Sequence, residues 1–231
     1  MIVQLTHPFL WRCKNWQPLL NNCIKFNTFC SRLEKQAVTL FPIEGAETEE
    51  ERKCKLDRIN KYKGEGFEIF VEAMIRLFPC DKRLGLIEGY NNDIRQDVGV
   101  DGFGICGYNQ KPMTVQCKYR QHDWELTANQ DHLTNFTSAS MLHYGVDQVT
   151  DPITGKCNML IISSADSLSF FTDHEMFGEK VYAFCRKEIR ALVDNNPTFW
   201  KYFAQSWAAS LELVKKDNIN ENKSYTKTTS V

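Results

Sequence analysis

Apolar residues recur at helical spacing over residues 66–78, where they occupy positions i, i+3, i+4, i+7, i+10 and i+11. This pattern predicts an amphipathic helix with one buried face, and Pro79 ends it. Glu68 and Glu72 lie four residues apart, off the centre of the buried face. A carboxylate at either position could reach a cleft at the edge of the core.

Period-two alternation predicts strands after this helix. Residues 98–107 carry four glycines, and residues 113–120 alternate between polar and apolar side chains. Glycines leave one side of a strand without bulk, so a backbone or a ligand can approach closely there. We expect the two runs to pair as a hairpin whose polar face gathers Asp101, Gln116 and Lys118.

The remaining elements predict an α/β progression. They are a short strand over 84–90, a helix over 127–143, a buried strand over 157–165, a short strand over 180–185, and helices over 186–193 and 197–214. The predicted fold class is α/β, or α+β with a mixed sheet of four to five strands flanked by helices.

Four regions follow from these patterns. Residues 1–63 are predicted to form a helical N-terminal extension that ends in a charged linker helix, and residues 64–194 the core domain. Residues 195–214 are predicted to form a C-terminal helix packed on the core. The polar residues 215–231 are predicted to be disordered.

Composition is that of an ordinary folded protein, with 231 residues of which 42% are hydrophobic. The net charge is −1, but residues 44–51 hold five acidic and no basic side chains, which leaves +4 for the rest. A modestly basic body is compatible with a polyanionic ligand.

Membrane insertion and export are not expected. No apolar run approaches the roughly 18 residues of a membrane span, and the first residues lack a basic leader with an apolar segment. We therefore expect a cytoplasmic, intracellular protein. Its nine cysteines, an odd number without a CxxC pair, predict buried reduced thiols rather than disulfides or a zinc site.

Glu68, Asp101, Gln116 and Lys118 have the chemistry that phosphodiester hydrolysis requires. A hard ion such as Mg²⁺ prefers carboxylate and carbonyl oxygens and retains several waters. A lysine two residues along a strand from such an oxygen lies on the same face, about 7 Å away, where it can neutralise charge on the same phosphate.

Three motifs, GEGFE at 64–68, DVGVDGFG at 97–104 and VQCKYR at 115–120, resemble the signature of a known nuclease family. This family is the Mrr-like branch of the PD-(D/E)XK, or restriction endonuclease-like, superfamily. The resemblance covers roughly residues 64–170 and implies a mixed sheet between helices.

Matched residue by residue, the resemblance implies that Asp101 is the metal-binding Asp and that Gln116 replaces the second acidic ligand. Lys118 corresponds to the catalytic Lys and Glu68 to the helix Glu. The implied activity is that of a Mg²⁺-dependent DNA endonuclease of the restriction type, in which Mn²⁺ can substitute for Mg²⁺. DNA is the implied partner.

Several nearby side chains are further candidates. Lys111, Arg120 and Lys180 are candidates for DNA phosphate contacts, against the alternative of ordinary surface charge. Asp97 is an even number of residues from Asp101, so on a strand it would lie on the same side and could be a second carboxylate in the site. We interpret it instead as the residue that closes the turn before the strand.

Two other functions remain open. One is a catalytically silent DNA-binding or assembly module with the same fold, which the near-neutral charge and the unmatched terminal helices favour. The other is a Holliday junction resolvase-like nuclease, which would be expected to act as a symmetric homodimer.

Overall fold

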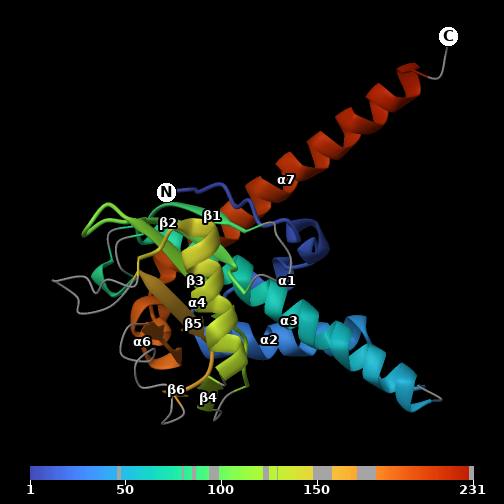
Figure 1. The fold of residues 1–231 in the computed structure, drawn as a ribbon. Coiled ribbons are helices and arrows are strands. Elements are labelled where there is room, and N and C mark those ends of the chain that lie inside the picture. Colours follow the sequence, from blue (N-terminus) through green and yellow to red (C-terminus); the bar gives the residue numbers. More distant parts are fainter. Residues whose placement is uncertain are drawn as a thin grey trace.

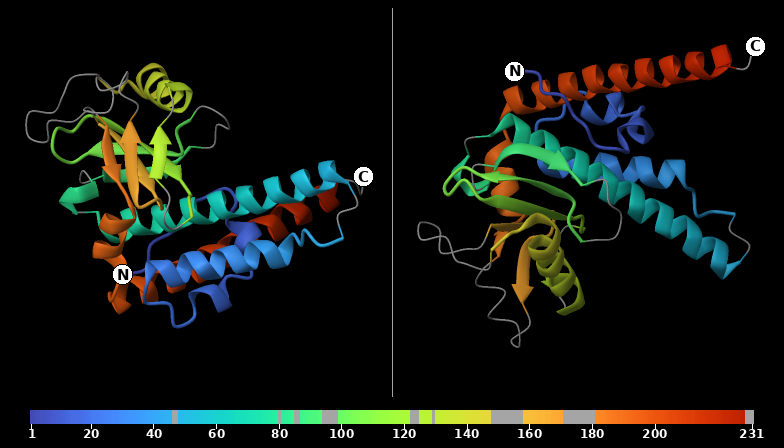
Figure 2. Two further views of the ribbon diagram at one scale, coloured as in Figure 1. Left: turned by 90° about the horizontal axis from the view of Figure 1, so that it is seen from below. Right: turned by 45° about the horizontal axis from the view of Figure 1, so that its top comes forward.

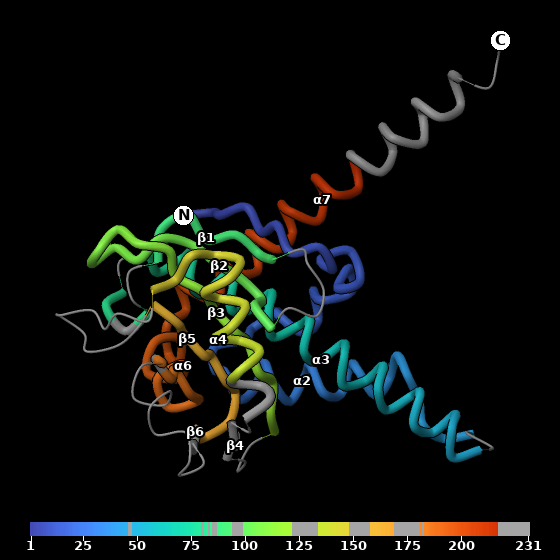
Figure 3. Tube along the Cα trace, in the orientation of Figure 1, coloured from blue at the N-terminus to red at the C-terminus, as the bar shows by residue number. Residues whose placement is uncertain are grey.

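A computed structural model describes most of the chain, and Figures 1 and 3 trace its path. The described residues are 1–45, 48–79, 81–84, 87–93, 99–121, 125–128, 130–147, 158–170 and 181–228. In chain order the elements are η1 (Leu10–Cys13), α1 (Gln17–Leu20), α2 (Phe26–Leu40), α3 (Glu49–Leu77), η2 (Lys82–Leu84), β1 (Ile87–Asn92), β2 (Gly102–Cys106), β3 (Pro112–Lys118), β4 (Glu125–Ala128), α4 (Gln130–Tyr144), β5 (Met159–Ser163), β6 (Ser167–Phe170), β7 (Tyr182–Phe184), α6 (Arg186–Val193) and α7 (Pro197–Thr228).

A five-stranded mixed sheet forms the centre of the fold, in the order β1-β2-β3-β5-β7. β1, β2 and β3 pair antiparallel, whereas β3, β5 and β7 pair parallel. The change occurs at β3 because α4 lies in the crossover that leads to β5, and parallel neighbours need such a connection. The predicted α/β class with a mixed sheet is confirmed, but the separate parallel pair of β4 and β6 was missed by the pattern.

Helices cover both faces of the sheet. α3 lies against one face with α2 and α7 packed on it, and α4 lies against the other (Figure 2). The layer around α3 is rich in aromatic rings, and the Phe70 centroid lies 5.1 Å from those of Phe26 and Phe29 and 5.9 Å from that of Phe203. Packed rings of this kind add to the free energy of burial, so the three helices form one core with the sheet.

β2 carries glycine where β1 comes closest. A side chain at Gly102 would collide with the ring of buried Tyr90, and one at Gly104 would lie 2.6 Å from the Glu88 carbonyl oxygen. The expected close approach on the side without bulk is therefore confirmed, and the approaching groups belong to β1.

α3 runs through the boundary that the sequence predicts between residues 63 and 64. Its first turn has a capping box, in which the Thr48 hydroxyl accepts the Glu51 N–H at 3.2 Å and the Glu51 carboxylate accepts the Thr48 N–H at 3.4 Å. Ile59 and Tyr62 are already buried in the same core as the rest of the helix. This corrects the predicted division, because the end of the proposed linker is an integral part of the core.

α7 extends past its predicted end. It spans Pro197–Thr228, whereas the sequence predicts a helix that ends at residue 214 and a disordered tail over residues 215–231. Residues 198–228 contain neither proline nor glycine, and the Lys215 ammonium lies 2.6 Å from the Glu212 carboxylate. Both features favour continuation of the helix beyond residue 214.

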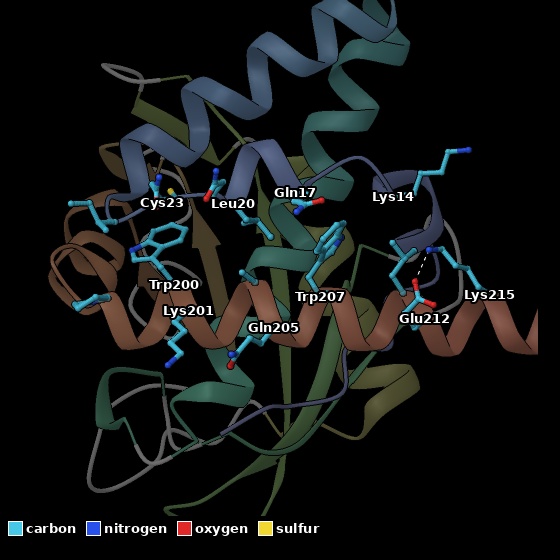
Figure 4. A pocket seen from close by; sticks show the side chains of 17 residues that line it. Lys14, Gln17, Leu20, Cys23, Trp200, Lys201, Gln205, Trp207, Glu212 and Lys215 are labelled. Atoms are coloured by element: carbon cyan, nitrogen blue, oxygen red, sulfur yellow. Dashed lines mark hydrogen bonds and ion pairs between the residues drawn. The ribbon is translucent and has the colours of Figure 1, made fainter.

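The N-terminal segment runs beside α7. The Leu5 N–H donates to the Ser210 hydroxyl at 2.8 Å, and the indole N–H of Trp207 donates to the Cys13 carbonyl at 3.2 Å. A hollow of about 780 Å³ lies between α7 and α1. Figure 4 shows its lining side chains, among them Trp207. The N-terminal segment is thus packed against the first half of α7.

Within the described ranges, no helix is long and apolar enough to cross a membrane. Seven cysteines fall in these ranges as free thiols, and six of them are buried while Cys54 is exposed. The predicted burial of most thiols is confirmed for these seven. Cys80 and Cys157 lie outside the described residues.

Two glycines of α3 should respond oppositely to alanine. A Cβ at Gly66 would lie 2.8 Å from Leu33 and 3.1 Å from Trp16, whereas a Cβ at Gly64 would meet no atom within 4 Å. We expect Gly66→Ala to lower the free energy of unfolding by about 1 kcal/mol through overpacking. Gly64→Ala should raise it by up to about 1 kcal/mol through helix propensity. Urea unfolding measures both, and equal increases would contradict the packing at Gly66.

Candidate active site

Asp101 stands immediately before β2, where its backbone is held by two neighbours. Its N–H donates to the Val115 carbonyl at 2.9 Å, and its carbonyl accepts the Asp93 N–H at 3.0 Å. Its Oδ2 accepts the Cys117 N–H at 2.6 Å. The carboxylate is thereby fixed beside the end of β3.

The surroundings of Asp101 disfavour its ionised form. Burial, and next the charge of Glu68, raise the pKa of Asp101 to about 7. The Cys117 N–H, Lys118 and His7 act in the opposite direction without cancelling this rise. Near neutral pH a bound cation would therefore draw the carboxyl toward its ionised form.

Glu68 reaches this place from α3 and is oriented by the N-terminal segment. Its Oε2 accepts a hydrogen bond from His7 Nε2 at 2.9 Å, and its side chain is 27% exposed. The Phe9 N–H donates to His7 Nδ1 at 3.3 Å. This contact assigns the His7 proton to Nε2, so that the ring donates to Glu68.

Glu72, one turn further along α3, has a structural role. It is fully buried, and its Oε1 accepts the Thr6 N–H at 2.7 Å and the Arg76 Nε–H at 2.8 Å. Its Oε2 accepts the His7 N–H at 3.1 Å. Glu72 thus holds the N-terminal segment against α3 and places the His7 ring beside Glu68.

Lys118 ends β3 on the side of Asp101. Its carbonyl accepts the Ser164 N–H at 3.1 Å and the Ser163 hydroxyl at 3.0 Å, so the backbone position is fixed. Its ammonium lowers the pKa of Asp101. Glu68, Asp101 and Lys118 therefore belong to one electrostatic cluster that also includes His7.

The Gln116 amide uses its nitrogen in a structural hydrogen bond, so that only its oxygen can serve the predicted metal site. Its side chain is buried, and Nε2 donates to the Gly99 carbonyl at 2.8 Å. The amide is thereby tied to the chain that leads into Asp101, and its oxygen Oε1 is the atom that could bind a metal. Thr114, two residues earlier in β3, contacts the Ser140 hydroxyl of α4 through its own hydroxyl at 2.8 Å.

Of the predicted phosphate contacts, one lies near Lys118 and another does not. Arg120 follows Lys118 closely and donates through Nη1 to the Tyr119 carbonyl at 2.7 Å. Lys111 precedes β3, at the opposite end of the strand from Lys118, and its Nζ lies 3.0 Å from the Asp147 carboxylate. The structure does not bring Lys111 to the cluster, because seven residues of strand extend over roughly 23 Å. Lys180 and Asp97 lie outside the described residues.

Sequence reasoning missed His7 and the structural role of Glu72. Glu72 carried a signal, because it interrupts an otherwise apolar run from Ile69 to Ile75 and an acid there needs a buried partner. His7 carried none, since its partner Glu68 is 61 residues away in the chain.

The cluster fits a hard divalent ion. Within the described part of the chain, no group of three or more His, Cys, Asp and Glu side chains could hold a metal. Mg²⁺ needs fewer protein ligands, because it binds through one or two carboxylates and keeps several waters. Asp101 and Glu68, whose charge raises the pKa of Asp101, are the two carboxylates that could hold such an ion, and Gln116 Oε1 is the third candidate oxygen.

The sequence matches no protein-family model, and neither a curated protein nor a solved structure shows significant similarity to it.

The raised pKa of Asp101 predicts a pH-dependent stability. Between pH 4 and 7 the folded carboxyl retains a proton that the unfolded chain releases, so stability falls as the pH rises through this window. Asp101→Asn keeps the acceptor for the Cys117 N–H but cannot ionise. In metal-free buffer we expect the variant to be more stable than the parent at pH 8, by on the order of 2 kcal/mol, and equally stable below pH 4. Urea unfolding across this range checks it, and parallel pH curves would contradict it.

Glu68 and Glu72 of α3 should differ in their effect on folding. Glu72→Ala leaves Arg76 and the N–H groups of Thr6 and His7 without their acceptor, so we expect a loss of about 3 kcal/mol or more in the free energy of unfolding. Glu68→Ala removes a single contact of a half-buried side chain, and we expect a loss of about 1 kcal/mol. Similar losses in urea unfolding would contradict the division of roles.

Proposed function

We propose that the protein is a Mg²⁺-dependent DNA endonuclease with a restriction endonuclease-like core of the Mrr type. One arrangement carries the proposal: the Cys117 N–H of β3 holds the Asp101 carboxylate at 2.6 Å, next in the chain to Lys118, and the charge of Glu68 from α3 raises the pKa of Asp101. Asp101, Lys118 and Glu68 are residues to which the family resemblance assigns the site. The mixed five-stranded sheet between helices agrees with the architecture of that family and supports the proposal.

The chain's own residues would hold and orient the metal ligands. When bound, a divalent ion supplies positive charge at the scissile phosphate and lowers the pKa of a water. Asp101 and Glu68 would bind it together with Gln116 Oε1. The Cys117 N–H fixes the Asp101 carboxylate, and the His7 ring fixes that of Glu68.

Lys118 would stabilise the charge that develops during hydrolysis. The water oxygen bonds to phosphorus while the bond to the leaving sugar oxygen breaks, so negative charge grows on the phosphate and leaving oxygens. The ammonium is held at the end of a strand whose backbone Ser163 and Ser164 fix. A positive charge that is already in place needs no reorganisation when this charge appears.

A catalytically silent DNA-binding module is the second candidate, and one observation favours it. The Gln116 amide is buried and donates to the Gly99 carbonyl, so this side chain has a structural role without a metal. A silent module would show no metal-dependent cleavage.

Lys118→Ala distinguishes the two candidates. If Lys118 acts mainly in the transition state, its removal should reduce cleavage by a factor of about a hundred or more. DNA affinity should fall less than about five-fold, because one phosphate contact contributes modestly to binding. Plasmid, linear and branched DNA with Mg²⁺, Mn²⁺ or EDTA provide the assay.

The parent protein in EDTA and the variant Lys111→Ala are the matched controls, since Lys111 lies at the far end of β3. Absence of cleavage by the parent on every substrate would support the silent module. Equal losses of cleavage and affinity in Lys118→Ala would show that Lys118 is an anchor rather than a catalytic group.

A further inference from the structure

A groove of about 510 Å³ lies between α3 and the end of β3, directly beside the candidate site. It begins at Lys118, and its other lining residues include Asn60, Lys63 and Gly64 from α3 together with Arg120 and Gln121. None of the described residues that line it is acidic. The groove therefore combines three cations with neutral side chains, of which Leu56, Cys117 and Tyr119 are largely apolar.

The cations come from two elements and converge on the same space. Lys118 and Arg120 are two residues apart, about 7 Å along an extended chain. Lys63 faces them from α3, where its Nζ lies 5.8 Å from the centre of the Tyr119 ring. Both charged groups are partly buried, and this burial lowers the pKa of Lys63 and of Arg120.

Glu34 is the acidic side chain that approaches this region from α2. Its Oε1 accepts the Tyr119 hydroxyl at 2.9 Å, and it lines a neighbouring hollow with Lys35. Glu34 partly offsets the effect of burial on Lys63. The groove nevertheless retains two further cations, Lys118 and Arg120, on its β3 side.

Gly64 gives a second, independent observation. Glycine is unfavourable in a helix interior, and α3 has it where an added Cβ would meet no protein atom within 4 Å. Packing accounts for Gly66, whose missing side chain leaves room for Leu33. No described neighbour accounts for Gly64, which lines the groove. A ligand that approaches the helix backbone closely would account for it.

We propose that this groove binds the phosphodiester backbone of a nucleic-acid strand, with Lys63 and Arg120 as phosphate contacts and Gly64 as the point of closest approach. The strand would lead away from the site at Lys118. The choice of polyanion rests on the proposed function. The cations and the open glycine are features of the groove itself.

Binding without turnover tests this inference. The probes are a fluorescein-labelled single-stranded 20-mer and the matching duplex, titrated in EDTA over a series of salt concentrations. Lys63→Gln should weaken binding about three- to five-fold and reduce the slope of log K against log salt by about one. Lys61→Gln is the matched control, because Lys61 lies two residues away with its Nζ 5.8 Å from the Phe9 ring, outside the groove. It should change the affinity less than two-fold.

Two variants of Gly64 complete the test. Gly64→Glu introduces bulk and a negative charge and should weaken binding ten-fold or more, whereas Gly64→Ala adds only a methyl group at the point of closest approach and should weaken binding about two- to three-fold. Thermal unfolding of both shows whether they are folded. The probe that binds more tightly identifies the preferred form of the strand, and either form supports the inference.

Failure of this inference differs from failure of the nuclease proposal. Equal affinities of Lys63→Gln and Lys61→Gln, or of Gly64→Glu and Gly64→Ala, would overturn the groove even if the parent cleaves DNA. No binding of either probe by the parent would also overturn it. Groove-dependent binding without any metal-dependent cleavage would support the inference and reject the nuclease.

Discussion

The buried carboxylate of Glu72 holds the N-terminal segment against α3. The position of the His7 ring beside Glu68 in the candidate site depends on that contact. A carboxylate without partners would be costly in this position, so its hydrogen bonds to Thr6, His7 and Arg76 are obligatory. Because these bonds fix the backbone of His7, the His7 ring reaches Glu68. The structural carboxylate of Glu72 therefore helps to position the carboxylate of Glu68, one turn away, which is a candidate metal ligand.

α3 connects this contact to the sheet. Its Phe70 packs against rings of α2 and α7, while the charge of Glu68 acts on Asp101, the residue before β2. Earlier in the same helix, Lys63 and Gly64 line the groove that begins at Lys118. Core, candidate metal site and candidate backbone groove thus share one rigid element, which favours a fixed geometry among them.

Local patterns were sufficient to predict the elements that carry the site. The helical spacing after Gly66, the glycines around Asp101 and the alternation through Gln116 and Lys118 predict elements that the structure contains. The same patterns could not predict contacts between distant parts of the chain. The Glu68 interaction with His7 and the shared core of α3 require knowledge of how the N-terminal segment folds back. The boundary at residue 63 was misplaced for this reason, since charge at helical spacing does not reveal a buried side such as that of Ile59 and Tyr62.

The central claim is that Asp101 and Glu68 share a site whose negative charge a divalent ion neutralises. Thermal unfolding in increasing Mn²⁺ at neutral pH measures this directly, because an ion that binds only the folded protein stabilises it by about 2.7 kcal/mol at a hundred times its Kd. The account predicts that the melting temperature of the parent rises with Mn²⁺, that Asp101→Asn loses most of the rise, and that Asp147→Asn, an exposed acid paired with Lys111, keeps it. An equal rise in all three proteins, or none in the parent, would contradict it.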